Sequence, residues 1–403
     1  MCKTTVILLT TLLVFTTSYC EDIFSWLKYL KHKATGLPAI VANPDGGYTA
    51  IWEEIGDKPS EMPGCPPRKY FYCIVDAAGK TIVSKREFEF WRLSTTPNYY
   101  AVLFNSKALL WLNPDSLLIL AWKWFFSGVT IDRVIVNSKG EIVDGPDSAL
   151  EAGVGEDAVL VKDHTGRVTA FDYGAGLRAM TVYPEFSKAR RMSRQEWKDI
   201  YDKYPSDMFT FRTPFPCMIT SEDKLLICGR LGWGKTPRSE RGPWDFFGRP
   251  DKGFYILADL DGNLASGLVV FDIVEYAFRK MPGIHLGGNY LSSSNNQNID
   301  ESDAADNDMD LSRLPNGDII LSVTGEDETR KLCVYQIKFT PEGEIEKPKR
   351  IEVVNPRPFP EDKILPVSKV TWARGIETRL VLFGFDEAGN FYAYREKWDK
   401  AKD

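Results

Sequence analysis

A segment rich in arginine and tryptophan has the residue types best suited to ligand binding in this 403-residue chain. It runs from Gly229 to Asp251 and also contains many Gly and Pro residues. Flat aromatic faces combined with guanidinium forks suit sugars or anionic ligands. We therefore expect a binding site built from Arg212, Arg230, Trp233, Arg238, Arg241 and Trp244. The structural alternative is a loop held in place by its own aromatic rings and salt links.

The same segment contains a match to the phosphate-binding loop, but its context argues against nucleotide binding. Residues 229–236 read GRLGWGKT and satisfy the pattern GxxxxGK[ST]. A phosphate loop needs a helix directly after its Lys-Thr pair, because the helix N-terminus holds the phosphate. Pro237 follows at once, and Gly242-Pro243 comes soon after. We expect no nucleotide at this position.

An acidic stretch, Asp300 to Asp310, is the nearest approach to a metal site. Asp306, Asp308 and Asp310 alternate as at the start of a calcium loop. An EF-type loop then needs Gly at its sixth position and Glu at its twelfth, where this chain has Leu311 and Gly317. We assign no metal and no cofactor, and calcium bound in another geometry is left open.

The usual catalytic motifs of hydrolases are missing from the sequence. The chain has three histidines and contains neither HExxH nor GxSxG. This excludes the common zinc proteases and serine hydrolases. An enzyme built on this chain would have to use carboxylates as its acids and bases, and the sequence assigns no catalytic residue.

A recurring hairpin pattern indicates the elements that position these residues. Two β-rich runs flank a turn that ends in DxxG or a close relative. The pattern occurs at 70–83, 133–143, 254–267, 334–346 and 380–394. A turn that needs a Gly with positive φ, between alternating apolar residues, is typical of a β-hairpin. Several hairpins of one kind predict a repeat architecture.

The pattern resembles that of β-propellers over nearly the whole chain from residue 37. We pair each hairpin with a preceding inner hairpin, which predicts an all-β fold of about six blades, with five to seven allowed. The expected blades are 37–92, 99–150, 154–185, 209–274, 306–353 and 365–398. A β-sandwich is the alternative fold. Residues 37–403 are expected to form a single domain.

Insertions and short helices interrupt this repeat. Residues 21–36 are expected to form an N-terminal helical segment, and Ser193–Tyr204 a helix that begins with a capping box and ends before Pro205. The other two predicted insertions are long loops, Gly229–Asp251 and Ile284–Asp310. Long loops in a compact domain are usually functional or disordered, so we expect function in these insertions.

One segment resembles sialidases and related propeller glycosidases. Phe211–Pro214 reads FRTP and precedes a strand pair that ends at Arg230. The resemblance implies that Arg212 is a carboxylate-binding arginine. The sequence departs from the family in having Thr213 in place of Ile, and it contains neither the SxDxGxTW box nor an assignable Tyr–Glu nucleophile pair.

The first 20 residues predict export. Lys3 precedes an uncharged run that is too short to span a bilayer, and small residues precede Cys20, where we expect signal-peptide cleavage. A bacterial lipoprotein acylated at Cys20 is the alternative. A secreted, periplasmic or cell-surface location follows. We expect no transmembrane segment, and the net charge of −6 gives no general reason to expect nucleic acid as a partner.

Export also makes disulfides available. Five cysteines remain beyond residue 20, so at least one is unpaired within a chain. If Thr220 pairs with Leu225 across a four-residue loop, Cys217 lies opposite Cys228, and these two are the disulfide candidates. Buried thiols are the alternative.

Two functions of different classes follow from the sequence. The first is an exported propeller that binds a carbohydrate, an anionic small molecule or a protein. The second is a propeller glycosidase or lyase that uses carboxylates and arginines. At least two acidic residues beside Arg212 in the central opening would favour the enzyme, and an opening lined by apolar side chains would favour the binding protein.

Overall fold

The computed structural model describes residues 38–55, 68–76, 80–89, 99–104, 106–125, 128–149, 154–155, 158–174, 176–191, 217–220, 224–231, 252–260, 269–272, 309–313, 319–326, 332–339, 349–352, 367–373, 379–385 and 391–397. These residues form six antiparallel sheets, numbered here along the chain.

The strands of the first three sheets are as follows. The first sheet contains β1 (Ala39–Ala42), β2 (Tyr48–Ile55), β3 (Arg68–Val75) and β4 (Thr81–Glu87). The second contains β5 (Tyr99–Leu103), β6 (Leu109–Asn113), β7 (Ser116–Phe125), β8 (Gly128–Asn137) and β9 (Ile142–Ala149). The third contains β10 (Val159–Lys162), β11 (Val168–Gly174), β12 (Gly176–Tyr183) and β13 (Arg190–Arg191).

The remaining strands form three further sheets. The fourth contains β14 (Cys217–Ile219), β15 (Leu225–Leu231), β16 (Lys252–Ala258) and β17 (Val269–Asp272). The fifth contains β18 (Met309–Arg313), β19 (Ile319–Glu326), β20 (Leu332–Phe339) and β21 (Lys349–Glu352). The sixth contains β22 (Val367–Ala373), β23 (Arg379–Phe385) and β24 (Phe391–Lys397).

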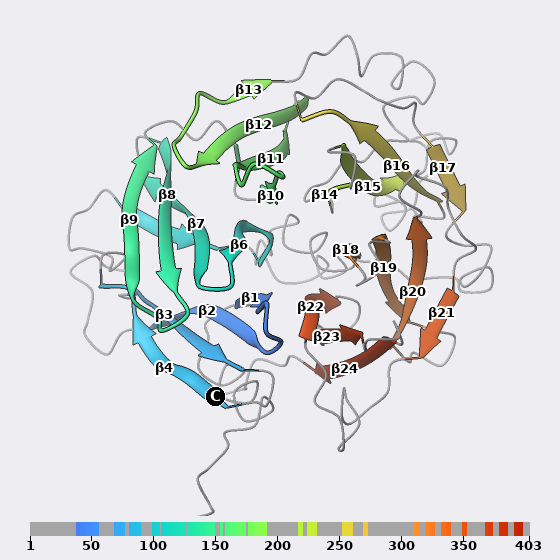
Figure 1. Ribbon diagram of the computed structural model, residues 1–403, viewed down its shortest axis with the longest axis horizontal. Helices are drawn as coiled ribbons and strands as arrows, with labels where there is room; N and C mark the ends of the chain where they lie inside the picture. Colours follow the sequence, from blue (N-terminus) through green and yellow to red (C-terminus); the bar gives the residue numbers. More distant parts are fainter. Residues whose placement is uncertain are drawn as a thin grey trace, which may run out of the picture.

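The sheets are arranged in a ring around a central axis, with β1, β6, β10, β14, β18 and β22 innermost (Figure 1). Chain order runs outward from the axis in each sheet, except that β5 and β6 of the second sheet both pair with β7. This arrangement is a β-propeller, so the prediction of an all-β propeller is confirmed. Except for β13, which lies just beyond the predicted end of the third unit, the strands fall within the ranges predicted for the repeat units.

Apolar side chains hold neighbouring sheets together. One cluster joins the first and second sheets through residues such as Tyr72, Phe88 and Ile119. A second joins the second and third sheets, and a third joins the fourth and fifth. The ring is closed where β1 packs against β22. Successive side chains of a strand point to opposite faces, so the second sheet presents Leu117 and Ile119 to the first sheet and Leu118 and Leu120 to the third.

The recurring turn has a common geometry on one side of the ring. In five turns the first residue donates its backbone N–H to the carbonyl of the residue four positions later, at 2.8–3.3 Å. These turns begin at Asn43, Asp76, Asn137, Asp163 and Thr220. In all but the Asn43 turn, the side chain of the first residue also accepts the N–H of the fifth.

Glycine is required at the fourth position of this turn in three cases. Gly46, Gly140 and Gly166 have φ values of 95°, 74° and 85°. L-residues with a side chain rarely adopt this conformation, whereas glycine does so without strain. The DxxG pattern in the sequence therefore encodes one turn: a side-chain acceptor at its start and a left-handed residue before its end.

The second sheet departs from the repeat at its inner edge. Both β5 and β6 pair with β7, and a 3₁₀ turn (Ser106–Ala108, labelled η2) separates them. This turn packs against β1 and β10, the inner strands of the two neighbouring sheets. The inner strand of this sheet is therefore interrupted close to the central axis.

Several predictions concern other parts of the chain. The signal peptide at residues 1–20, the helical segment at 21–36 and the helix at Ser193–Tyr204 lie outside the described residues. Within the described part of the chain, no helix is long and apolar enough to cross a membrane.

Candidate functional site

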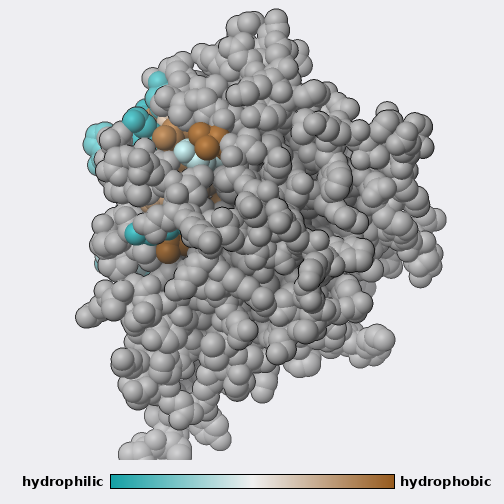
Figure 2. Space-filling view, turned by 90° about the vertical axis from the view of Figure 1, so that its right-hand side faces the viewer, coloured by the Kyte–Doolittle hydropathy of each residue, from teal (hydrophilic) through white to brown (hydrophobic). Residues whose placement is uncertain are grey.

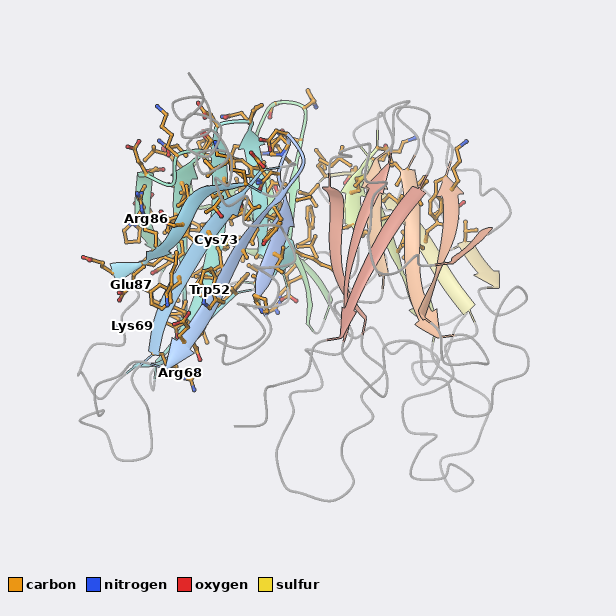
Figure 3. The ribbon with its side chains drawn as sticks, turned by 90° about the horizontal axis from the view of Figure 1, so that it is seen from below. Trp52, Arg68, Lys69, Cys73, Arg86 and Glu87 are labelled. Carbon is orange, nitrogen blue, oxygen red and sulfur yellow. The ribbon has the colours of Figure 1, made fainter. Side chains whose placement is uncertain are left out.

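The two ends of the sheets define two faces of the propeller. Strands alternate in direction, so the five turns described above lie on one face, which we call the turn face. The connections from the second to the third strand of a sheet, and from each sheet to the next, leave from the opposite face. We call this the loop face. In Figure 3, Arg68 and Lys69 lie toward the lower end of the first sheet, which is the loop face, and Cys73 lies farther up.

The three predicted insertions all start and end at strand termini on the loop face. The first lies between Arg191 in β13 and Cys217 in β14. The second lies between Leu231 in β15 and Lys252 in β16, and the third between Asp272 and Met309. Because β14 and β18 are innermost strands, the first and third insertions rejoin the propeller beside its axis.

Among the six predicted ligand residues, Arg230 lies in a described strand. It is the penultimate residue of β15 and is opposite Gly253 in β16, at the loop face. Arg212, Trp233, Arg238, Arg241 and Trp244 lie outside the described residues.

The inner strands of the first four sheets are apolar. The sequences of β1, β6, β10 and β14 are AIVA, LLWLN, VLVK and CMI, and none of them contains an acidic residue. Ala39, Ile40 and Val159 to Val161 are buried. These four strands therefore contribute no carboxylate to the central opening, whereas β18, the inner strand of the fifth sheet, contains Asp310.

Charged side chains near the loop-face ends of the first three sheets form ion pairs. The nitrogen–oxygen distance is 3.0 Å for Arg68–Glu53, 2.6 Å for Lys85–Glu54 and 2.6 Å for Lys123–Asp132. Arg178 pairs with Asp172 in the third sheet. The Glu54 carboxylate also accepts a 2.7 Å hydrogen bond from Trp52 Nε1. These pairs fix the ends of the strands from which the loop-face connections leave.

The hydroxyl of Tyr70 is part of the same structural network. It accepts a 3.1 Å hydrogen bond from the backbone N–H of Val102, which links the first sheet to the second. Burial, reinforced by the nearby Glu53 carboxylate, raises the pKa of Tyr70 well above its ordinary value. The hydroxyl therefore stays protonated at physiological pH and serves as a link between sheets rather than as a base.

The predicted pairing of Cys217 with Cys228 is wrong. Ile219 lies opposite Leu225, so Cys217 lies opposite Ile227. The reason is the turn: Thr220 pairs with Lys224 through its backbone and its hydroxyl, which leaves three intervening residues instead of four. A shift of one residue moves Cys228 to the other face of the sheet from Cys217. Both are reduced thiols, and Cys228 is buried.

A metal site has no support in the described part of the chain, where no group of three or more His, Cys, Asp or Glu side chains is placed to hold an ion. The acidic stretch Asp300–Asp310 lies mostly outside this part. Its last residue, Asp310, is the second residue of β18 and lies opposite Ser322.

Sequence reasoning missed the buried charges that link strands and sheets. These include Asp132, Arg133 and Asp172, each at most 6% exposed. The sequence contained a signal for them, since Asp132 and Arg133 are adjacent charged residues in the otherwise uncharged strand β8, and Asp172 is the single charged residue of β11. Such a residue needs a partner when it is buried. The partner could not be read from the sequence, because it lies on another strand or in another sheet.

The described surface shows no broad apolar area in the view of Figure 2. Brown apolar atoms lie beside teal polar atoms in a narrow zone near one edge. The exposed large hydrophobic residues of the described chain are Ile82, Ile142 and Val143, on the outer strands β4 and β9.

Comparisons with known proteins found no matching family model and no matching curated protein. Solved structures are similar in part. A protein of unknown function from Dyadobacter fermentans is 10% identical, with 91% of this chain and 94% of that chain covered and a TM-score of 0.41. A glycoside hydrolase family 43 arabinoxylan arabinofuranohydrolase from Bacillus subtilis is 10% identical, with 87% and 76% covered and a TM-score of 0.36. Likenesses at these scores carry no conclusion about function.

Proposed function

We propose that this chain is an exported β-propeller that binds a sugar-like or anionic ligand on its loop face. The six sheets would each be one blade of the propeller. Arg212, Arg230, Trp233, Arg238, Arg241 and Trp244 would contact the ligand. Export rests on the pattern of residues 1–20, and acylation at Cys20 would convert the secreted protein into an anchored one.

The observation that carries this proposal is that the three insertions leave from the same face of the propeller. All three leave from strand ends on the loop face, and Arg230 lies at such an end. Loops from different blades can converge there, around the central opening. On the opposite face, the turns that begin at Asp76, Asn137 and Asp163 are short, and their polar side chains accept hydrogen bonds within the turns themselves.

The composition of the second insertion supports the ligand class. Trp233 and Trp244 offer flat surfaces for stacking, and Arg238 and Arg241 offer paired donors for a carboxylate, sulfate or phosphate group. A ligand with both a ring and an oxyanion would use both kinds of residue.

The test is a glycan panel that contains neutral, uronic-acid and sulfated oligosaccharides, applied to the parent protein and to a Trp233→Ala, Trp244→Ala double variant. The parent is expected to bind a subset, and the double variant to lose that binding while its circular dichroism and thermal unfolding stay unchanged. Equal binding by both proteins would show that the tryptophans are structural.

A glycosidase or lyase is the second candidate, and one observation favours it. The acidic stretch ends in β18, the innermost strand of the fifth sheet, while the Arg212 segment precedes β14, the innermost strand of the fourth. These two sheets pack against each other. Two carboxylates near Arg212 would allow acid–base chemistry of the sialidase-like kind. Release of reducing sugar from a ligand of the panel, abolished by Asp308→Asn, would favour this candidate.

A further inference from the structure

The sixth sheet has an open outer edge in the part of the chain that the structure describes. Its strand order is β22-β23-β24, with β22 at the propeller axis and β24 farthest from it (Figure 1). In each of the other five sheets, the strand at this third position pairs with a further, outer strand; these strands are β3, β8, β12, β16 and β20. The outer edge of β24 is therefore a row of backbone N–H and C=O groups that a further strand can pair with.

β24 also lacks the features that protect the outer strands of the other sheets. β13 has two residues, β17 and β21 have four each, and the pairings of β4 and β9 contain register shifts. β24 has seven residues, FYAYREK, and pairs with β23 at every position without a shift. It contains neither proline nor glycine, and its aromatic residues favour extended backbone. A long, regular edge strand of this kind is a template for pairing with another strand.

The sequence of β24 is complementary to itself when two copies run in opposite directions. Full overlap of the seven residues places Tyr394 opposite Tyr394 of the other copy. The remaining pairs are Phe391–Lys397, Tyr392–Glu396 and Ala393–Arg395. No charged residue then lies opposite a like charge. In a parallel pair, each of the three charged residues would lie opposite its own copy, and like charges directly opposite each other are unfavourable.

We propose that this protein forms a two-fold symmetric dimer in which the β24 strands of two copies pair antiparallel and join their sixth sheets into one. Such a contact uses the same surface of both copies and is closed. The sheet cannot grow further, because its other edge, β22, lies at the propeller axis and packs against β1 and β18. The contact uses none of the residues assigned to the ligand, so the two proposals are tested separately.

Two tyrosines of β24 provide matched positions for a cross-linking test. Tyr392 and Tyr394 are two residues apart and therefore share a face of the sheet. In the proposed dimer Tyr394 lies opposite its own copy. Tyr392 is four residues from its own copy along the ladder, which is about 14 Å. A disulfide requires Cα atoms within about 7 Å of each other, so a cysteine can be bridged at residue 394 and not at residue 392.

The experiment compares the parent with Tyr394→Cys and Tyr392→Cys, by light scattering and, after mild oxidation, by non-reducing electrophoresis. The parent is expected to have twice the mass of one chain at about 100 µM, where a dimer with a micromolar dissociation constant is almost completely formed. Tyr394→Cys is expected to form a covalent dimer. Tyr392→Cys is expected to cross-link no more than the parent, whose own cysteines give the background.

Two lysine variants give a second readout that needs no cross-link. Tyr394→Lys places like charges opposite each other and is expected to weaken the dimer about fivefold in sedimentation experiments. Tyr392→Lys places a lysine opposite Glu396 and is expected to leave the dimer as stable as in the parent, or more so. A parent that stays a monomer at the stated concentration would overturn the proposal, because another segment or partner would then cover this edge. A dimeric parent would also overturn it if Tyr394→Cys formed no cross-link, or if the two cysteine variants cross-linked equally.

Discussion

Gly140 shows how a single residue joins two sheets. Its carbonyl accepts hydrogen bonds from Tyr72 Oη and, at 2.5 Å, from Arg86 Nη1, so the turn after β8 is bound to the first sheet. A Cβ atom placed at this position would lie 2.8 Å from the Val83 side chain. The residue is therefore constrained both by its φ of 74° and by its neighbour.

A comparison of two alanine variants separates these constraints. Gly166 also has a positive φ, of 85°, but a Cβ there would meet nothing within 4 Å. Gly166→Ala is expected to cost only the left-handed strain, about 1 kcal/mol. Gly140→Ala is expected to cost about 1–3 kcal/mol more, from overpacking against Val83. Urea unfolding measures both, and equal costs would mean that the first sheet yields to the added methyl group.

Asp163 makes the recurring turn sensitive to acid. Burial alone would raise the pKa of this carboxyl group, but hydrogen bonds from Thr165 and Arg167 outweigh it and place the pKa below the ordinary 3.8. The charged form is therefore bound more strongly in the folded protein than in the unfolded chain. The resulting stability is present above pH 3.8 and is lost as the pH falls through the lower, folded-state pKa.

Two substitutions test this turn. Asn fills the same position in the turn at residue 137, so Asp163→Asn is expected to keep the backbone hydrogen bonds and to cost less than about 1 kcal/mol, since the Arg167 partner is half exposed. Asp163→Ala is expected to cost about 1–2 kcal/mol at pH 7. Unfolding curves between pH 2 and pH 7 should show the difference between the parent and Asp163→Asn shrinking toward the acid end. A difference that is independent of pH would contradict the assignment.

At the scale of elements, Arg133 links the second sheet to the third. Its guanidinium donates to the carbonyl oxygens of Val182, at 3.0 Å, and Pro184, and it pairs with Asp147. The Phe186 ring centroid lies 5.3 Å from the guanidinium carbon. Arg133 is buried, whereas the Asp147 side chain is 50% exposed, so the carbonyl bonds and the ring contact outweigh the ion pair.

Arg133→Met is therefore expected to destabilise the fold by about 2–4 kcal/mol, because two carbonyl groups lose their donor. Arg133→Lys keeps the charge but not the planar fork, so it is expected to recover little of the loss. Thermal and urea unfolding of the two variants measure this. A lysine variant as stable as the parent would show that charge alone provides the link.

Cys228 gives a test of the hairpin register. Burial raises the pKa of its thiol well above the usual value, with a smaller contribution from Cys217. Native protein is expected to leave Cys228 unmodified by iodoacetamide, and protein unfolded in urea to be modified fully. Peptide mapping without reductant should show no Cys217–Cys228 bridge, even after oxidative refolding. Finding that bridge would contradict the observed register.

The outer strands show how the propeller protects its open edges. In β9, Asp144 and Asp147 are exposed and Pro146 lacks a backbone N–H, and the pairing with β8 contains register shifts. Charges, proline and bulges on an edge strand oppose pairing with another chain. These features offset the exposed Ile142 and Val143 of the same strand.

The order of most strands could be predicted from the sequence, but the exact geometry of the turns could not. Apolar alternation and the DxxG pattern predicted strands such as β3, β8 and β11, because both signals are local. The Thr220 turn was mispredicted because it lacks the glycine, so its length could not be read from the pattern. The contacts of Arg133 with Val182 and Pro184 could not be predicted, because these partners become neighbours only when the sheets pack, and the pairing of Asp172 with Arg178 depends on the register of β11 and β12.

At the scale of the whole molecule, the ring closes through packing of β1 against β22, and every described sheet consists of consecutive strands. This topology separates two tasks. The described turns of the turn face are short and are stabilised by their own side chains, and the three insertions leave from strand ends on the loop face. A protein built in this way can vary its ligand contacts on one face without disturbing the sheets that support them.

The most direct test of a ligand site on the loop face compares two double variants with the same change of charge. Arg238→Gln with Arg241→Gln alters the second insertion, and Lys80→Gln with Lys139→Gln alters exposed positions on the turn face. Affinity for an acidic oligosaccharide that the parent binds is measured by calorimetry. We expect the loop-face variant to bind at least about tenfold more weakly, and the turn-face variant within about twofold of the parent. Equal losses in the two variants, or full affinity in the loop-face variant, would contradict the assignment of the ligand site to the loop face.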